Sequence, residues 1–351
     1  MPDRKQAAGV MLTRRAALVG ATGLIGATAF SRGLLAQDAT RVTVTSYGGI
    51  FEKVMREKVI PRFEKETPYK VNLVVTDEPD IVSKLVIGRG RPAFDAITVN
   101  HETAIMLGEA GLLMDDQQTK FKNAADIYPN MMPPKTAVYG TTIYKFDFVY
   151  RTASFPTVPT SWQDLWNPGL SIGVPSVTQP YGITFLYLAA RLNGGSAGNL
   201  DPGFKAIKRL SKFKIYNTAS QGMQLFQQNE VDAAFYYSHR AQQMKDLGLP
   251  VERTEPKEGV YTQITGTQIP KGAANLPGAL AWADFTLSEG YQGALAEQLY
   301  SPTNKRVPLP KEKTASFITG DAAVSELLSP PWAELMPQRD AILDQWRKEI
   351  G

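Results

Sequence analysis

The chain has 351 residues, of which 43% are hydrophobic and 21% charged, so it is long enough for two lobes with separate cores and has the composition of a soluble globular protein. Its net charge of +4 comes entirely from residues 1–36, and the neutral remainder shows no electrostatic signature of a nucleic-acid-binding protein. The absence of cysteine excludes a disulfide scaffold, a thiolate nucleophile and most structural zinc sites.

Residues 12–36 are predicted to be a targeting segment. Arg14 and Arg15 precede an uncharged run rich in alanine, glycine and leucine, which ends before Arg32, and a small-residue cleavage site follows near Ala36. This is the order of regions in a signal peptide. The paired arginines resemble the twin-arginine export motif, although the usual aromatic residue and lysine are absent. We expect export to the periplasm and removal of a signal peptide, 1–36, near residue 36. The general secretory route and an uncleaved membrane anchor remain alternatives.

The first hundred residues after the leader alternate strands and helices. Such alternation predicts parallel strands with right-handed crossovers, and sheets of this kind bind ligands at the carboxyl ends of their strands. Here those ends are Ser46–Gly49 and Asn100–His101. The predicted strands are 41–46, 71–75 and 94–99, and the predicted helices are 51–66, 81–87 and 103–110.

A second α/β unit follows. Its short strands are rich in bulky apolar residues, and its last helix, 340–350, carries apolar residues on one face. The predicted strands are 171–175, 214–217 and 231–237, with an extended segment at 264–270, and the predicted helices are 184–192, 220–228, 278–287 and 292–300.

Motifs of known enzymes give little support for catalysis. Residues 194–198 fit the G-x-S-x-G string of serine hydrolases, but they follow a predicted helix rather than a strand, so they are expected to form a loop. No P-loop or H-E-x-x-H motif occurs. We predict no catalytic residue, no cofactor and no metal ligand. A ferric-ion binder that uses the Tyr236–Tyr237 pair and a periplasmic enzyme exported by the twin-arginine route remain alternatives.

Five motifs occur in order along most of the chain after the leader. They are a strand, a Gly-Gly turn and a helix ending in FEKET at 63–67, then FDAI at 94–97, PTSWQDLWNP at 159–168, EVDAA at 230–234 and PKEG at 256–259. In this order they resemble the bacterial solute-binding proteins of the spermidine/putrescine-binding family.

The resemblance implies an α/β type II periplasmic-binding fold with two lobes, each a mostly parallel sheet flanked by helices, joined by two crossing strands. It also implies a monomeric, non-enzymatic binding protein. Its partners would be a small-molecule solute and the permease subunits of an ABC transporter in the inner membrane, and the lobes would close by a hinge. The expected boundaries are 40–142 plus 267–312 for lobe one, 143–266 for lobe two, 313–351 for a C-terminal helical tail packing on the lobes, and 141–144 and 265–269 for the crossings.

The resemblance alone would make the solute a polyamine. Polyamine binders of this family present acidic residues at the start of the second-lobe helix and after the PKEG motif. The corresponding segments here, 177–183 and 260–265, contain neither aspartate nor glutamate. A buried ammonium without a carboxylate partner is costly, so we favour an organic carboxylate or zwitterion over putrescine or spermidine. Asp147, near the first crossing, keeps a cationic solute possible.

The predicted solute-binding residues lie at strand ends or just before helices of the expected cleft. Tyrosines there could provide walls and hydroxyl donors, and helix N-terminal amides before Ile183 favour an anion. Arg240 is a weaker candidate because it could equally face solvent, whereas Trp162 and Trp166 are expected to be packing residues. The predicted residues are Ser46, Tyr47, Gly48, Asn100, His101, Thr178, Tyr181, Gly182, Tyr237, His239 and Gln263.

Overall fold

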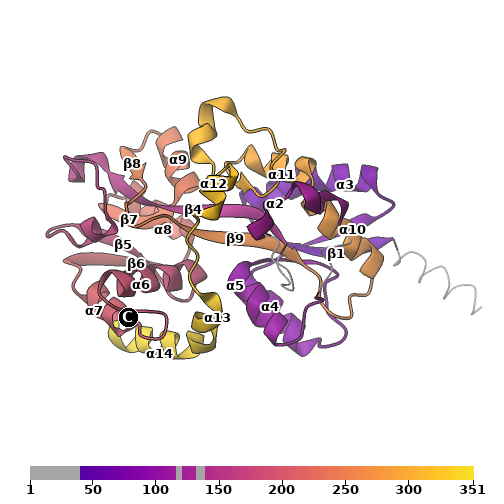
Figure 1. Cartoon of the computed structure of the whole chain (residues 1–351), viewed down its shortest axis with the longest axis horizontal. Coiled ribbons are helices and arrows are strands. Elements are labelled where there is room, and N and C mark those ends of the chain that lie inside the picture. The colour runs from indigo at the N-terminus through magenta and orange to yellow at the C-terminus, as the bar shows by residue number, and fades with distance from the viewer. Residues whose placement is uncertain (1–39, 116–120, 132–138) are drawn as a thin grey trace, which may run out of the picture.

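The computed structural model describes residues 40–115, 121–131 and 139–351 as an α/β fold (Figure 1). The predicted signal peptide and its cleavage site lie outside these residues. Within them, no helix combines the length and the apolar character that crossing a membrane would need.

The described strands form a two-stranded sheet and an eight-stranded sheet. In the first, β1 (Arg41–Ser46) pairs in parallel with β2 (Lys70–Val75), and a parallel bridge from Val44 to Ala96 leads to β3 (Ile97–Asn100). In the second, the order is β3-β9-β4-β7-β5-β6, with β8 and β10 also paired to β4. The remaining strands are β4 (Gly140–Arg151), β5 (Ser171–Pro175), β6 (Lys212–Tyr216), β7 (Ala233–Tyr237), β8 (Val251–Thr254), β9 (Tyr261–Gln268) and β10 (Ser301–Pro302).

Strand direction differs from the sequence-based expectation at the centre of the large sheet. β5 pairs in parallel with β6 and β7, as predicted. β4 and β9 are antiparallel to every strand they pair with, including each other. The prediction of mostly parallel sheets is therefore wrong for this sheet, which is mixed. The sheet is mixed because the chain crosses between the two halves of the molecule once along β4 and returns along β9, so these two strands lie side by side in opposite directions (Figure 1).

In Figure 1, helices lie both above and below the central strands β4 and β9. The predicted helix 51–66 is present but contains one π-helical turn, η1 (Met55–Val59), between α2 (Ile50–Val54) and α3 (Ile60–Glu66). The other α-helices are α4 (Glu78–Ile87), α5 (His101–Glu109), α6 (Pro180–Leu192), α7 (Asp201–Lys208), α8 (Ala219–Gln227), α9 (Ser238–Asp246), α10 (Leu276–Thr286), α11 (Glu289–Ala296), α12 (Asp321–Ser325), α13 (Trp332–Leu335) and α14 (Arg339–Glu349). The 3-10 turns are η3 (Lys122–Asp126), η4 (Pro129–Met131), η5 (Thr152–Ser154), η6 (Trp162–Trp166), η7 (Lys311–Ser316) and η8 (Met336–Gln338).

Two large hydrophobic clusters form most of the core. The first, called the β5–β7 cluster here, is centred on Trp162, Phe185 and Phe235, which are all fully buried. The second, called the α3–α10 cluster, includes Phe63 and Trp282, whose rings meet edge to face with centroids 5.0 Å apart. Trp162 packs in the first cluster, as expected from the sequence, and its indole nitrogen donates to the carbonyl oxygen of Gly259.

Strands β4 and β9 each contribute to both clusters. On β4, Ile143 belongs to the α3–α10 cluster and Phe146 to the β5–β7 cluster. On β9, Ile264 belongs to the α3–α10 cluster and Tyr261 to the β5–β7 cluster. Ile143 and Ile264 pair across the two strands, as do Phe146 and Tyr261. The chain therefore passes from one core to the other at the same level on both strands.

The C-terminal helices pack on both clusters: Val324, in α12, is buried in the α3–α10 cluster, whereas α13 and α14 pack on the β5–β7 cluster. The side chains of Trp332, Leu335, Ile342 and Trp346, from α13 and α14, are buried in the β5–β7 cluster. The predicted helix 340–350 corresponds to α14, and its apolar face is the face that is buried. Residues from the end of the chain thus complete a core that begins at Phe146.

Gly266 permits the close approach of β9 to the start of β4. A Cβ atom at this position would lie 2.1 Å from the carbonyl oxygen of Tyr139, which is backbone and cannot move aside cheaply. By contrast, a Cβ atom at Gly293, in α11, would lie no closer than 3.9 Å to any neighbour. The same glycine-to-alanine change is therefore expected to have opposite effects at the two positions.

We predict that Gly266→Ala lowers the free energy of unfolding by about 1–3 kcal/mol, the usual cost of overpacking. Gly293→Ala should raise it by about 0.5–1 kcal/mol, because alanine loses less backbone entropy in a helix than glycine. Urea denaturation followed by circular dichroism measures both changes. Equal stability of the two variants would contradict the backbone contact described for β9.

Candidate functional site

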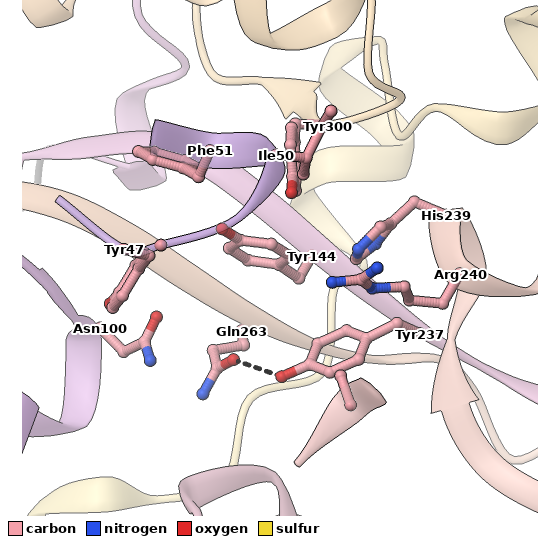
Figure 2. Close-up of a pocket in the computed structure, with 12 residues that line it drawn as sticks. Tyr47, Ile50, Phe51, Asn100, Tyr144, Tyr237, His239, Arg240, Gln263 and Tyr300 are labelled. Atoms are coloured by element: carbon pink, nitrogen blue, oxygen red, sulfur yellow. Dashed lines mark hydrogen bonds between the residues drawn. The ribbon is translucent and has the colours of Figure 1, made fainter. Parts of the chain in front are cut away.

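A cavity of about 200 Å³ lies where β4 and β9 meet the ends of β1, β3 and β7 (Figure 2). Its lining comes from segments distant in the sequence: the loop after β1, the start of α2, the ends of β3 and β7, and the first turns of α8 and α9. The lining residues are Tyr47, Gly48, Ile50, Phe51, Asn100, Tyr144, Ala219, Tyr237, His239, Arg240, Gln263 and Tyr300.

Six of the predicted binding residues line this cavity. The rule that ligands bind at the carboxyl ends of strands led to four of them, and the resemblance to a known family led to Tyr237 and to Gln263, on β9. They are Tyr47, Gly48, Asn100, Tyr237, His239 and Gln263.

The other five predicted residues are not among those that line the cavity. Ser46 is buried at the end of β1, where its hydroxyl donates to the carbonyl oxygen of Tyr47. His101 is the first residue of α5, and burial lowers the pKa of its imidazole. Thr178 is exposed, and its hydroxyl is 2.9 Å from that of Ser176.

Tyr181 and Gly182, in the first turn of α6, are used in packing. The Tyr181 ring is buried 5.4 Å from that of Tyr237, and its hydroxyl donates to the carbonyl oxygen of Asn217. A Cβ atom at Gly182 would lie 2.0 Å from the carbonyl oxygen of Ser176. Glycine therefore allows α6 to approach the turn that precedes it, which explains this residue without a ligand.

Sequence reasoning missed five lining residues and gave Arg240 too little weight. Tyr144 could have been found, because it lies in a strand predicted to cross the cleft and alternation places it on the same face as Phe146. Phe51 and Tyr300 carry no local signal, since their helical spacing is that of ordinary core residues. The missed residues are Ile50, Phe51, Tyr144, Ala219 and Tyr300.

Aromatic rings form a continuous wall of the cavity (Figure 2). Tyr47 meets Phe51 edge to face at 5.7 Å, and Phe51 meets Tyr300 at 5.8 Å. Tyr144 contacts Tyr300 at 5.4 Å and Tyr237 at 5.8 Å, also edge to face. Such pairs favour fixed orientations, so the packing of these rings against one another holds the wall in place.

Arg240 brings a positive charge to one side of the cavity. Its Nη1 donates to Gln243 Oε1 at 3.1 Å, whereas its buried Nε has no hydrogen-bond partner. Among residues 40–115, 121–131 and 139–351, no carboxylate forms an ion pair with Arg240. Burial and the charge of Arg240 lower the pKa of His239 to about 3, so this imidazole is neutral at pH 7.

Two acidic side chains lie behind the opposite side of the cavity. Glu78 Oε1 accepts hydrogen bonds from the Tyr47 hydroxyl at 2.5 Å and from the Asn100 backbone N–H at 3.1 Å. Glu102 Oε1 accepts from Gln263 Nε2 at 2.8 Å. Burial raises the pKa of both carboxyls, and burial together with the charge of Glu78 raises the pKa of Glu102 to about 8. Neither glutamate was singled out from the sequence.

Asp147, the sequence-based candidate for binding a cation, is already paired. Its carboxylate is fully buried on β4, 2.8 Å from Arg253 Nη1 and 3.4 Å from Lys145 Nζ. It is not among the residues that line the cavity. The two basic side chains neutralise it, so the expectation that Asp147 could receive a cationic solute is not supported by its surroundings.

The tyrosine pair considered for ferric-ion binding is divided between two environments. The Tyr236 hydroxyl donates to the carbonyl oxygen of Ala219, whereas the Tyr237 hydroxyl donates to Gln263 Oε1 at 3.1 Å. In the described part of the chain, no three His, Cys, Asp or Glu side chains are grouped closely enough to hold a metal ion.

Comparison with known proteins gives a consistent result. A family model described as bacterial extracellular solute-binding protein matches residues 58–319. The spermidine/putrescine-binding periplasmic protein of Escherichia coli (strain K12) is 21% identical over 310 residues, which cover 84% of this chain and 83% of that protein.

Solved structures share the fold. An ABC transporter structure from Clostridium perfringens is 22% identical with a TM-score of 0.75, covering 88% of this chain and 100% of that chain. A structure described as the Atu4243-GABA receptor is 20% identical with a TM-score of 0.73, covering 88% and 96%. These likenesses establish an α/β fold of the periplasmic-binding kind.

We predict that the His239 imidazole stays neutral well below the ordinary pKa of 6.5, because burial and Arg240 disfavour its charged form. The protein has two histidines, so His101→Gln leaves a single ring to follow by NMR. Its nitrogen shifts should remain constant from about pH 8 to pH 5. A titration midpoint near 6.5 would contradict a desolvated ring beside a guanidinium.

Proposed function

The chain belongs to the bacterial extracellular solute-binding proteins, and from this premise we propose that it binds a small organic carboxylate or zwitterion in the cavity and delivers it to an ABC importer. Membership of this non-enzymatic family agrees with the expectation that the protein is not an enzyme. The relatives include a polyamine-binding protein and a GABA receptor, so similarity alone does not choose the solute. The choice depends on the side chains that line the cavity.

Arg240 is the observation that carries the proposal. A guanidinium presents its donors in a fixed fork that matches a carboxylate, and such charge-assisted hydrogen bonds are stronger than neutral ones. Arg240 reaches the cavity from α9, and its buried Nε lacks a partner (Figure 2). Leaving a buried donor unsatisfied costs free energy, which a bound carboxylate would recover.

The same side chain argues against a polyamine. A diamine spanning the cavity would place one ammonium group beside the positive charge of Arg240. The neighbouring His239 is neutral at pH 7 and carries no negative charge that could balance an ammonium group. Asp147 is already neutralised by Arg253 and Lys145. The acid-free segments 177–183 and 260–265 point in the same direction.

We further propose that solute capture closes two lobes about β4 and β9. The two hydrophobic clusters support a division near the expected boundaries 142/143 and 266/267, although Ile143 and Ile264 pack with the α3–α10 cluster. The change of cluster lies between Ile143 and Phe146 on β4 and between Tyr261 and Ile264 on β9. Tyr47 and Asn100 would then belong to one lobe, and Tyr237 and Arg240 to the other. A solute that contacts both sides stabilises the closed form, which is the form that the permease subunits of the transporter would recognise. The protein would act as a monomer in the periplasm.

Arg240→Gln is predicted to weaken binding of carboxylate-bearing solutes by at least about tenfold. The reason is that a hydrogen bond to a charged group contributes about 1.5–3 kcal/mol, and 1.4 kcal/mol corresponds to a factor of ten. A thermal-shift panel of mono- and dicarboxylates, amino acids, putrescine and spermidine identifies binders. A solute at a hundred times its Kd adds about 2.7 kcal/mol to the free energy of unfolding.

Arg347→Gln is the matched control, because Arg347 is exposed on α14 and pairs only locally with Asp344. It should leave every affinity unchanged. Stabilisation by polyamines alone, or equal carboxylate binding by Arg240→Gln and the wild type, would refute an anion-binding role.

For localisation, we predict that the chain recovered from the periplasm begins near residue 37, as measured by intact mass. If the twin-arginine route is used, replacing Arg14 and Arg15 together by lysine should retain the protein in the cytoplasm. Normal secretion of that variant would indicate the general secretory route instead.

A further inference from the structure

The two sides of the cavity differ in charge. Arg240 approaches from α9, whereas Tyr47, Asn100 and Gln263 lie across from it (Figure 2). Immediately behind these three polar residues lie the carboxyl groups of Glu78 and Glu102, because each accepts hydrogen bonds from them. A solute that spans the cavity therefore meets a guanidinium at one end and an acid-backed polar surface at the other.

Glu102 is fully buried and Glu78 is half-buried, and two neighbouring carboxyl groups in such surroundings are unfavourable when both are charged. Glu102 has no exposed surface, and its Oε2 has no hydrogen-bond partner. Within the described part of the chain, no lysine or arginine forms an ion pair with Glu78 or Glu102. A buried acid without a cation destabilises the fold unless it is neutral or acquires a partner. No basic side chain in the described part of the chain therefore stabilises the charged form of Glu102.

Glu102 also fixes the orientation of a lining side chain. Gln263 Nε2 donates to Glu102 Oε1, which leaves Gln263 Oε1 as the acceptor on the cavity side, where it receives the Tyr237 hydroxyl. An amide oxygen has two lone pairs, so this oxygen can accept a second N–H. A nearby aromatic wall, which includes Tyr47 and Phe51, also favours a cation.

We propose that the solute is a zwitterion whose carboxylate binds Arg240 and whose ammonium group binds on the opposite side against Gln263, with Glu102 and Glu78 supplying the negative charge behind it. This inference rests on the proposed function and narrows its solute from a carboxylate or zwitterion to an amino-carboxylate. Glu102 is a positioning residue in this arrangement, because it acts through the Gln263 amide.

In this arrangement, binding of the ammonium group should release a proton from the protein. Because the pKa of Glu102 is raised to about 8, this carboxyl is mostly protonated at pH 7 in the empty protein. An ammonium group nearby lowers that pKa, so binding releases a proton from Glu102 or its partner Glu78. Tyr47 and Tyr237 are close enough for the charge of Glu102 to raise their pKa values, and His101 is its neighbour in the chain. Helix α13 packs on α5, and its one charged side chain, Glu334, is exposed. The two tyrosines have raised pKa values and His101 a lowered one, so none of these three changes charge near pH 7.

The experiment compares three sets of probes of matched chain length: those with both a carboxylate and an amine, those with the carboxylate alone and those with the amine alone. Calorimetry measures the affinities of β-alanine, γ-aminobutyrate and ε-aminocaproate, of the matching carboxylates propionate, butyrate and caproate, and of the matching alkyl amines. We expect at least one amino-carboxylate to bind the wild type at least about tenfold more tightly than its matching carboxylate. In Glu102→Gln this preference should be lost, with carboxylate affinity changed by less than about threefold.

Glu109→Gln, on the exposed end of the same helix, is the control and should retain the preference. A structural defect in Glu102→Gln would weaken both classes of probe equally. A second measurement needs no variant: calorimetry of the wild type in two buffers of different ionisation enthalpy. At pH 7 the amino-carboxylate should release up to about one proton, and the matching carboxylate none.

Each outcome is decisive. Equal binding of amino-carboxylates and carboxylates, an unchanged preference in Glu102→Gln, or binding without proton release overturns the zwitterion proposal while carboxylate capture by Arg240 stands. Binding of amines alone, or of no carboxylate-bearing probe, overturns both proposals.

Discussion

The antiparallel pairing of β4 with β9 is the constraint on which the rest of the structure depends. These strands are the only described ones that contribute side chains to both large hydrophobic clusters, and they change cluster at the same level. The same pairing places Tyr144 directly opposite Gln263, so two walls of the cavity are set by one register. A slip of one residue would turn both side chains to the other face and separate the cavity from its lining.

A second theme is how the protein distributes charge. After the leader, acidic and basic residues are equal in number, so long-range attraction does not select the solute. Selectivity must arise locally, from a guanidinium on one side of a small cavity and buried carboxyls behind the other. Charges act strongly on one another over short distances where burial removes water from around them, as at Glu102.

The sequence predicted the fold class, most strands and half of the cavity lining, because strand ends and turns have local signatures. It did not predict the antiparallel course of β4 and β9, since strand direction depends on distant partners rather than on composition. Tyr181 and Gly182 were assigned to the site from the position of their helix, but packing of that helix against Ser176 accounts for them. Glu102 was not singled out because its raised pKa comes from burial, which the residue type does not reveal.

The position of Trp346 in the β5–β7 cluster has a consequence for the order of folding. Its partners in that cluster begin two hundred residues earlier, at Phe146. A ribosome must therefore translate every residue from Phe146 to Trp346 before this core can close, and long-range contacts of this kind fold slowly. The nascent chain consequently lacks a complete β5–β7 cluster until Trp346 has been added. A frameshift or nick in α14 would expose apolar surface formed by residues translated long before.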